Sequence, residues 1–264
     1  MVTSASSPGR RSNLAWWAGL LIVAAFAWVL LIDRSPGMPA AMAGPWLVFA
    51  EFLLLWVVMM AAMMLPSVAP VATMYLRVVR SKRTGPAGAH TAAMVGGYLL
   101  AWAGFGVLAY GLSRSLGTLA PMTGPGKPMG MDTAPATRTV WSAAVILAVA
   151  GLYQFSPLKE RCLRHCRSPL GFLLHFGTYS GRLRDVRAGA YHGAYCVGCC
   201  WSLMLILVAV GLMNWAWMIG LTAVVFVEKI WRSGPAFGYV VGGALIGAAV
   251  LLPWLPNVQT ALLS

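Results

Sequence analysis

The stretch "YHGAYCVGCCWSLMLILVAVGLM", residues 191–213, joins a cluster of sulfur and imidazole side chains to a long apolar run. The run from Trp201 onward is typical of a helix in a lipid bilayer, whose hydrocarbon core takes about 20 apolar residues to cross. The cluster before it holds three of the chain's five cysteines and one of its four histidines. The stretch therefore predicts a membrane helix with a thiol-rich site at its mouth.

Composition extends the membrane interpretation to the whole chain. Of its 264 residues, 59% are hydrophobic and 9% are charged, whereas a soluble domain is about 25% charged. The mean hydropathy of +0.76 excludes an ordinary water-soluble protein. The first apolar run, from Asn13, is too long for a cleaved signal peptide, and no small-residue cleavage site follows it. We therefore predict an all-α fold, a polytopic bundle of transmembrane helices with the lipid bilayer as its surroundings.

Seven apolar segments are predicted as spans, and six is the alternative because the turn around Asn214 is very tight. They form one membrane domain, residues 14–255, between short tails at residues 1–13 and 256–264. The predicted spans are Leu14–Ile32, Trp46–Leu65, Ala92–Leu112, Val140–Phe155, Ala194–Met213, Trp215–Ile230 and Phe237–Leu255. Pro66 and Pro70, just beyond the second span, are expected to break or kink its helix.

Lysine and arginine predict the orientation, because cytoplasmic loops of membrane proteins are enriched in them. Fifteen of the 19 fall into one alternate set of loops and four into the other. This bias predicts a cytoplasmic N-terminus in a multi-pass protein of the bacterial inner membrane. It also explains the net charge of +13 without nucleic acid as a partner. The outer loop 113–139 is rich in Pro and Gly, and the basic inner loop 156–191 contains "SPLGFLLHF" (168–176), a predicted interfacial helix.

All five cysteines lie within residues 162–200, together with three of the four histidines. In a helix that turns about 100° per residue, four of these side chains share one face within about 100°, namely His192, Cys196, Cys199 and Cys200. The earlier motif "ERCLRHC" places Cys162 and Cys166 one turn apart, with His165 on the flank. The two groups are therefore predicted half-sites that can face each other.

Thiolates and imidazoles are ligands for soft metals, which favours Cu(I) and leaves Zn(II) as the second candidate. Arginines at 161, 164 and 167 surround the first pair with positive charge, which favours thiolates. Two other interpretations stay open. The cysteines can cycle between dithiol and disulfide, although the cytoplasmic side disfavours a permanent disulfide. They can also simply pack, because a free cysteine behaves as a small hydrophobe.

The second span ends in "VVMMAAMMLPSVAP" (57–70), which carries two methionine pairs at helical spacing. Met59 pairs with Met63, and Met60 with Met64. Thioethers suit Cu(I), while ordinary core packing is the alternative. Because the spans run in opposite directions, the methionines and the cysteines are expected in the same, cytoplasmic half of the membrane. If the two groups meet there, the combined thiolate and thioether ligands favour copper over zinc.

Four further polar residues lie within or at the ends of the predicted spans. Glu51 is the one acid well inside a predicted span, and an intramembrane carboxylate is a functional candidate by default, here for a proton or cation path. A neutral, hydrogen-bonded glutamate is the alternative. Glu228 and Lys229 end the sixth span, where we expect them to snorkel to the interface or to pair locally. His90 is assigned no role.

Three motifs in this order resemble a bacterial family described as predicted metal-binding integral membrane proteins. They are "MMAAMMLPSVAP" (59–70), "YQFSPLKERCLRHCRSP" (153–169) and "GAYHGAYCVGCCWSLM" (189–204). The resemblance covers most of the chain and implies a metal-binding membrane protein. It also implies that the five cysteines and the four methionines from 59 to 64 correspond to the cysteines and methionines of the family's motifs.

The sequence thus predicts a membrane protein that binds a soft metal, copper before zinc, and transfers, stores or transports it rather than catalysing a reaction. Its primary thiolates are Cys196, Cys199 and Cys200, with His192 as an added nitrogen ligand. Cys162 and Cys166 form a second pair that docks or hands over metal. A metallochaperone or a membrane complex is the expected partner. The alternatives are a thiol-redox protein and a non-catalytic assembly subunit, and no ATP-binding motif indicates a pump.

Overall fold

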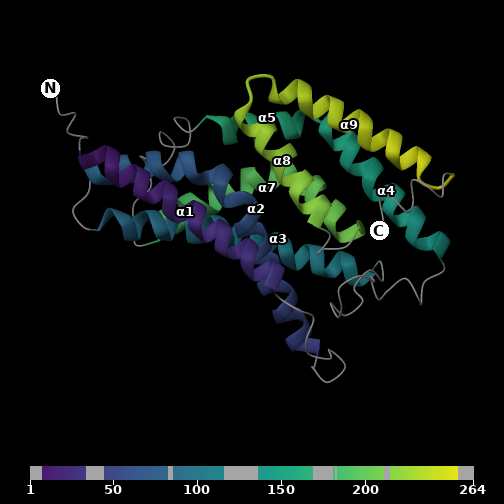
Figure 1. Ribbon diagram of the computed structural model, residues 1–264, viewed down its shortest axis with the longest axis horizontal. Helices are drawn as coiled ribbons and strands as arrows, with labels where there is room; N and C mark the ends of the chain where they lie inside the picture. The colour runs from purple at the N-terminus through teal and green to yellow at the C-terminus, as the bar shows by residue number, and fades with distance from the viewer. Residues whose placement is uncertain are drawn as a thin grey trace.

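A computed structural model describes residues 8–33, 45–82, 86–115, 136–168, 181, 183–210 and 215–254 of the chain. These residues form helices without a strand (Figure 1), so the predicted all-α fold is confirmed. The helices are α1 (Pro8–Asp33), α2 (Pro45–Lys82), α3 (Ala87–Ser115), α4 (Ala136–Gln154), α5 (Pro157–Arg167), α7 (Arg184–Val210), α8 (Trp215–Ile230) and α9 (Gly234–Leu251).

The described helices include several that are long and apolar enough to cross a membrane. Four meet both criteria, within α2, α3, α7 and α9, and a fifth is added if α4 and α5 are one span bent by 65°. Each of the seven predicted spans falls on one helix, but α1 has an apolar part of only Ala15–Leu31 and α8 is 16 residues long. The number of spans and the orientation therefore stay predictions.

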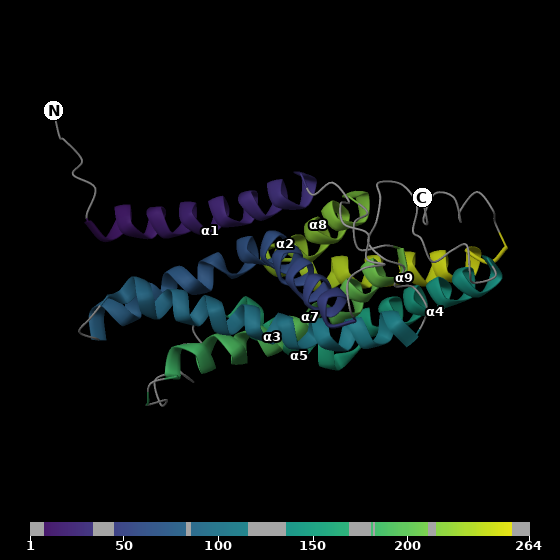
Figure 2. The same ribbon diagram turned by 90° about the horizontal axis from the view of Figure 1, so that it is seen from below.

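Helix α7 lies at the centre of the bundle and packs against α3, α4, α5 and α8. Its contact with α3 is the most extensive, because two glycines let the backbones touch. A methyl group added at Gly189 would lie 1.7 Å from the carbonyl oxygen of Met94, and one at Gly97 would lie 2.0 Å from that of Val186. Around this centre, α1 packs on α2 and α4 packs along α9 (Figure 2).

Helix α2 differs from the predicted second span. The chain stays helical through Pro66 and Pro70 and continues to Lys82, so of the predicted break or kink, the break does not occur. Side-chain hydroxyls bond to carbonyls beside the prolines, with Ser67 Oγ 2.8 Å from the oxygen of Met64 and Thr73 Oγ1 2.9 Å from that of Pro70. The helix changes direction along its length (Figure 2), as proline-containing helices do.

Helices α5 and α7 reshape the predicted inner loop. The chain turns by 65° after α4, and the Ser156 hydroxyl accepts a hydrogen bond from Leu158 N to cap α5. Helix α7 begins at Arg184, ten residues before the predicted span, because the small residues Ala188 and Gly189 pack against α3. The cysteines consequently lie in the middle of a 27-residue helix, not at its mouth. The proposed interfacial helix from Pro169 onward, and most of the outer loop, lie outside the described residues.

Candidate metal centre

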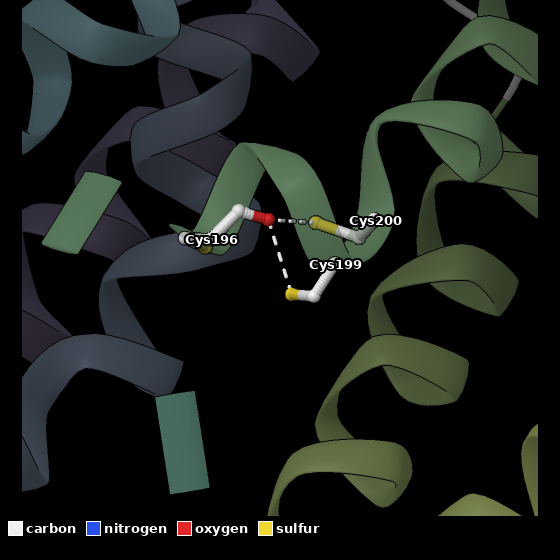
Figure 3. Close-up of side chains that lie close together, drawn as sticks. All are labelled: Cys196, Cys199 and Cys200. Atoms are coloured by element: carbon white, nitrogen blue, oxygen red, sulfur yellow. Dashed lines mark hydrogen bonds between the residues drawn. The ribbon is translucent and has the colours of Figure 1, made fainter. Parts of the chain in front are cut away.

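The three cysteines of α7 form a compact group that we call the thiol cluster: Cys196, Cys199 and Cys200. Their Sγ atoms all lie within 4.8 Å of one another, and all three side chains are buried. Figure 3 shows the sulfurs of Cys199 and Cys200 directed at the carbonyl oxygen of Cys196, at 3.1 and 3.0 Å. The predicted common face is therefore present, and sulfurs at this separation are close enough to share one soft metal ion.

Helix α5 brings the other two cysteines to the cluster. Cys166 Sγ lies 4.0 Å from Cys199 Sγ. Cys162 packs against the backbone of α7 at Gly198. A methyl group added to this glycine would lie only 2.8 Å from the sulfur of Cys162. Cys166 is half-buried, whereas the other four cysteines are buried. The two predicted half-sites thus face each other, and Cys166 of α5 is the least buried of the five cysteines.

Both predicted histidines lie beside the cluster, among aromatic rings. His165 stacks on Tyr195 with ring centroids 3.9 Å apart, and its ring lies 6.5 Å from that of His192. His192 is buried and lies 6.0 Å from the ring of Tyr98. Neither imidazole belongs to the compact group formed by the three sulfurs. Their role as nitrogen ligands stays a prediction.

The sulfur of Cys196 has two polar partners that sequence reasoning missed. Lys229 Nζ from α8 lies 3.0 Å from it, and the Tyr98 hydroxyl from α3 lies at the same distance. Lys229 Nζ also donates to Ser67 Oγ of α2, at 3.1 Å. The expectation that Lys229 snorkels to the interface is therefore wrong, because its ammonium points into the bundle. No spacing within the sequence signals these contacts between distant helices.

The neighbouring residue, Glu228, is buried and pairs with a lysine of another helix, so it neither snorkels to the interface nor pairs locally. Its carboxylate oxygens lie 2.7 and 2.8 Å from Lys159 Nζ, and the two side chains are 2% and 4% exposed. This ion pair joins α8 to α5. Because α5 carries Cys162 and Cys166, the pair also holds their sulfurs beside α7. Removing one partner of such a pair leaves the other charge buried and uncompensated, which strongly destabilises the fold.

The methionine stretch of α2, residues Met59, Met60, Met63 and Met64, is buried in the hydrophobic core. The three cysteines of the thiol cluster border the same core. A hydrogen-bonded link between α2 and the cluster runs through Ser67 and Lys229. Glu51 is exposed on the outside of α2, while the next residue, Phe52, is buried. The exposed carboxylate does not line the core, and a proton or cation path through it stays a prediction.

A second polar network lies where α2, α3 and α7 meet, and it gives His90 a partner. His90 Nδ1 lies 2.6 Å from Asp185 Oδ2, and the Tyr75 hydroxyl donates to the other oxygen of this buried carboxylate. Asp185 lies in the first turn of α7, where its negative charge also interacts favourably with the helix dipole. The network therefore anchors the start of the helix that carries the thiol cluster.

Comparison with known proteins agrees with a metal site. Residues 53–252 match the PpoB2 family, which is described as copper chaperones. The matched region contains all five cysteines, the methionine stretch, Tyr98 and Lys229, but not Glu51. No curated protein and no solved structure matches the chain. Because the family match covers well over half of the sequence, this chain belongs to the PpoB2 family of copper chaperones.

Proposed function

We propose that the chain is an integral membrane copper chaperone that holds Cu(I) on the thiol cluster and passes it to a partner protein. The observation that carries the proposal is the compactness of the cluster, whose three buried sulfurs lie within 4.8 Å of one another. We place it in the bacterial inner membrane as one domain, residues 14–255, with seven spans and a cytoplasmic N-terminus. The family match supports copper as the cargo.

The donor set favours Cu(I) over Zn(II). Structural zinc takes four ligands in a tetrahedron, whereas Cu(I) accepts fewer thiolates. The compact group offers three sulfurs, and neither an imidazole nor a carboxylate joins it within the described residues. The histidines are proposed as auxiliary, weaker ligands, and the methionine stretch, which is buried in the core, is proposed to pack rather than to bind the metal. A three-sulfur site therefore suits the monovalent ion best.

Transfer is proposed to run through Cys166. Cys166 is the one half-buried residue among the five cysteines, and its sulfur lies 4.0 Å from that of Cys199. Copper moves by ligand exchange, in which a bond from Cu(I) to the incoming thiolate forms as a bond to the outgoing thiolate breaks. The copper keeps its oxidation state, and the released thiolate takes up a proton. Cys162 supports the same step from the neighbouring turn, and the acceptor is a metallochaperone or a subunit of a membrane complex.

One observation favours a second function, thiol redox chemistry. The 4.0 Å between Cys166 and Cys199 is short enough for a small movement to bring the sulfurs into bonding distance. Oxidation to a disulfide would release two protons and two electrons to a membrane partner. This function predicts a readily trapped disulfide and no bound metal. An assembly subunit, by contrast, would keep its function when the cysteines are changed to serine.

The test is copper content per chain, measured on protein purified under reducing conditions in mild detergent from cells given copper and zinc together. We expect about one copper per chain in the wild type and none in Cys196→Ser/Cys199→Ser/Cys200→Ser. The matched control is Met204→Leu, which removes a buried sulfur of α7 outside the cluster. It should retain the metal. A folded wild type without copper would contradict the proposal.

A further inference from the structure

Lys229 places a positive charge against the thiol cluster from the end of α8. Its Nζ lies 3.0 Å from Cys196 Sγ and 3.1 Å from Ser67 Oγ. The sulfurs of Cys199 and Cys200 lie within 4.8 Å of that of Cys196. A metal–sulfur bond is about 2.3 Å long, so a metal on Cys196 lies within roughly 5 Å of the ammonium.

The carboxylate of the preceding residue, Glu228, does not cancel the positive charge of Lys229. Glu228 holds Lys159 through both oxygens, at 2.7 and 2.8 Å, and these two charges neutralise each other. The Tyr98 hydroxyl, which also contacts Cys196, is uncharged in its ordinary form. The charges of Lys229, Glu228 and Lys159 therefore sum to one positive charge.

We propose that Lys229 determines the charge selectivity of the cluster and favours monovalent over divalent soft metal ions. The inference rests on the proposed function and deepens it. When two ions occupy the same set of thiolates, the ligand charges are the same in both complexes. The complexes then differ by one unit of positive charge, which the ammonium repels. This difference does not depend on how many thiolates bind.

The size of the effect follows from the short distance. Two unit charges about 5 Å apart, at the effective dielectric constant of about 20 that suits protein sites, correspond to a preference on the order of a hundredfold. Cu(I) and Zn(II) are the natural pair for comparison, because they have the same number of electrons and differ by one charge. Ag(I) and Cd(II) form a second such pair.

The experiment measures affinities for Cu(I) and Zn(II) by chelator competition on the full chain in mild detergent, for the wild type, Lys229→Met and Lys229→Arg. The readout is the ratio of the two affinities, because a general loss of packing weakens both ions together. We expect Lys229→Met to lower the Cu(I)-to-Zn(II) ratio by about a hundredfold. Lys229→Arg keeps the charge and should keep the ratio within about threefold.

A Lys229→Met protein that binds Cu(I) with the wild-type ratio would overturn the inference. So would a Lys229→Arg protein whose ratio falls as far as that of Lys229→Met. The Ag(I) and Cd(II) pair repeats the measurement without copper redox chemistry and must give the same shift. A wild type that binds neither monovalent ion would instead overturn the proposed function, which separates the two failures.

Discussion

The thiol cluster of α7 and the methionine stretch of α2 are both buried sets of soft sulfur ligands at helical spacing, yet their surroundings differ. Around the cluster, polar groups converge from other helices: Lys229 from α8, the Tyr98 hydroxyl from α3, and Cys166 from α5. The methionines are packed in the hydrophobic core with Phe52 and Trp56, and the three cysteines border the same core from α7.

This difference distinguishes a candidate metal site from a packed hydrophobic core, although both contain sulfur. Burying polar groups costs free energy unless they find partners, so a bundle that gathers an ammonium, a hydroxyl and thiols at one point does so for a reason other than packing. Methionine fills irregular apolar space without any such partner. The comparison therefore supports the proposal that the cysteines of α7 bind the metal and that the methionines of α2 pack, and the predictions below test it.

The largest effect is expected from the ion pair that holds α5 against the bundle. Lys159→Met leaves the Glu228 carboxylate buried without its partner and should lower the free energy of unfolding by about 3–5 kcal/mol. Denaturant unfolding in mild detergent measures it. The matched control is Glu160→Gln on the same helix, which removes an exposed pair with Arg164 and should cost less than about 1 kcal/mol. Equal losses in the two variants would contradict the role given to the buried pair.

The next effect is on copper affinity. It concerns Cys199, the cysteine of α7 whose sulfur lies next to Cys166 of α5. Cys199→Ser removes a sulfur of the cluster and the neighbour of Cys166, so affinity should fall by more than the roughly 10–100-fold that losing an outer partner costs. Chelator competition measures the loss. Met204→Leu serves again as the control on α7. An affinity within about threefold of the wild type would remove Cys199 from the ligand set.

A smaller loss is expected when a polar partner of the cluster is removed and every ligand is kept. Tyr98→Phe deletes the hydroxyl that contacts Cys196 Sγ, and copper affinity should fall by roughly 10–100-fold. Tyr110→Phe, on the same helix and packed against Phe49 and Phe52, is the matched control and should leave affinity unchanged. If both variants bind copper equally well, the hydroxyl does not tune the cluster.

The smallest effect belongs to the methionine stretch. Each Met→Leu change conserves volume and should cost less than about 1.5 kcal/mol of stability. Copper affinity of a variant with leucine at all four positions should stay within about threefold of the wild type. Thermal unfolding and chelator competition on the same preparation measure both quantities. A tenfold loss of copper affinity with an intact fold would make the methionines ligands and erase the contrast with α7.

Sequence reasoning predicted the helices well, because long apolar runs specify them, and it predicted the common face of the thiol cluster, because helical spacing alone decides it. It missed the start of α7, where polar residues such as Arg184 and Asp185 interrupt the apolar pattern while neighbouring small residues pack on α3. It could not predict the partners of Cys196, since Lys229 lies 33 residues away and Tyr98 lies 98 residues away in the chain. Contacts of that kind depend on how the helices assemble, which no local pattern records.

The most direct measurement is X-ray absorption at the copper edge, made on copper-loaded protein in mild detergent. It compares the wild type with the variant that has leucine at positions 59, 60, 63 and 64. If thiolates of α7 hold the metal, as proposed, we expect the same number of sulfur neighbours in both proteins. A loss of one or more sulfur neighbours in the leucine variant would place the copper on α2 and contradict the central claim.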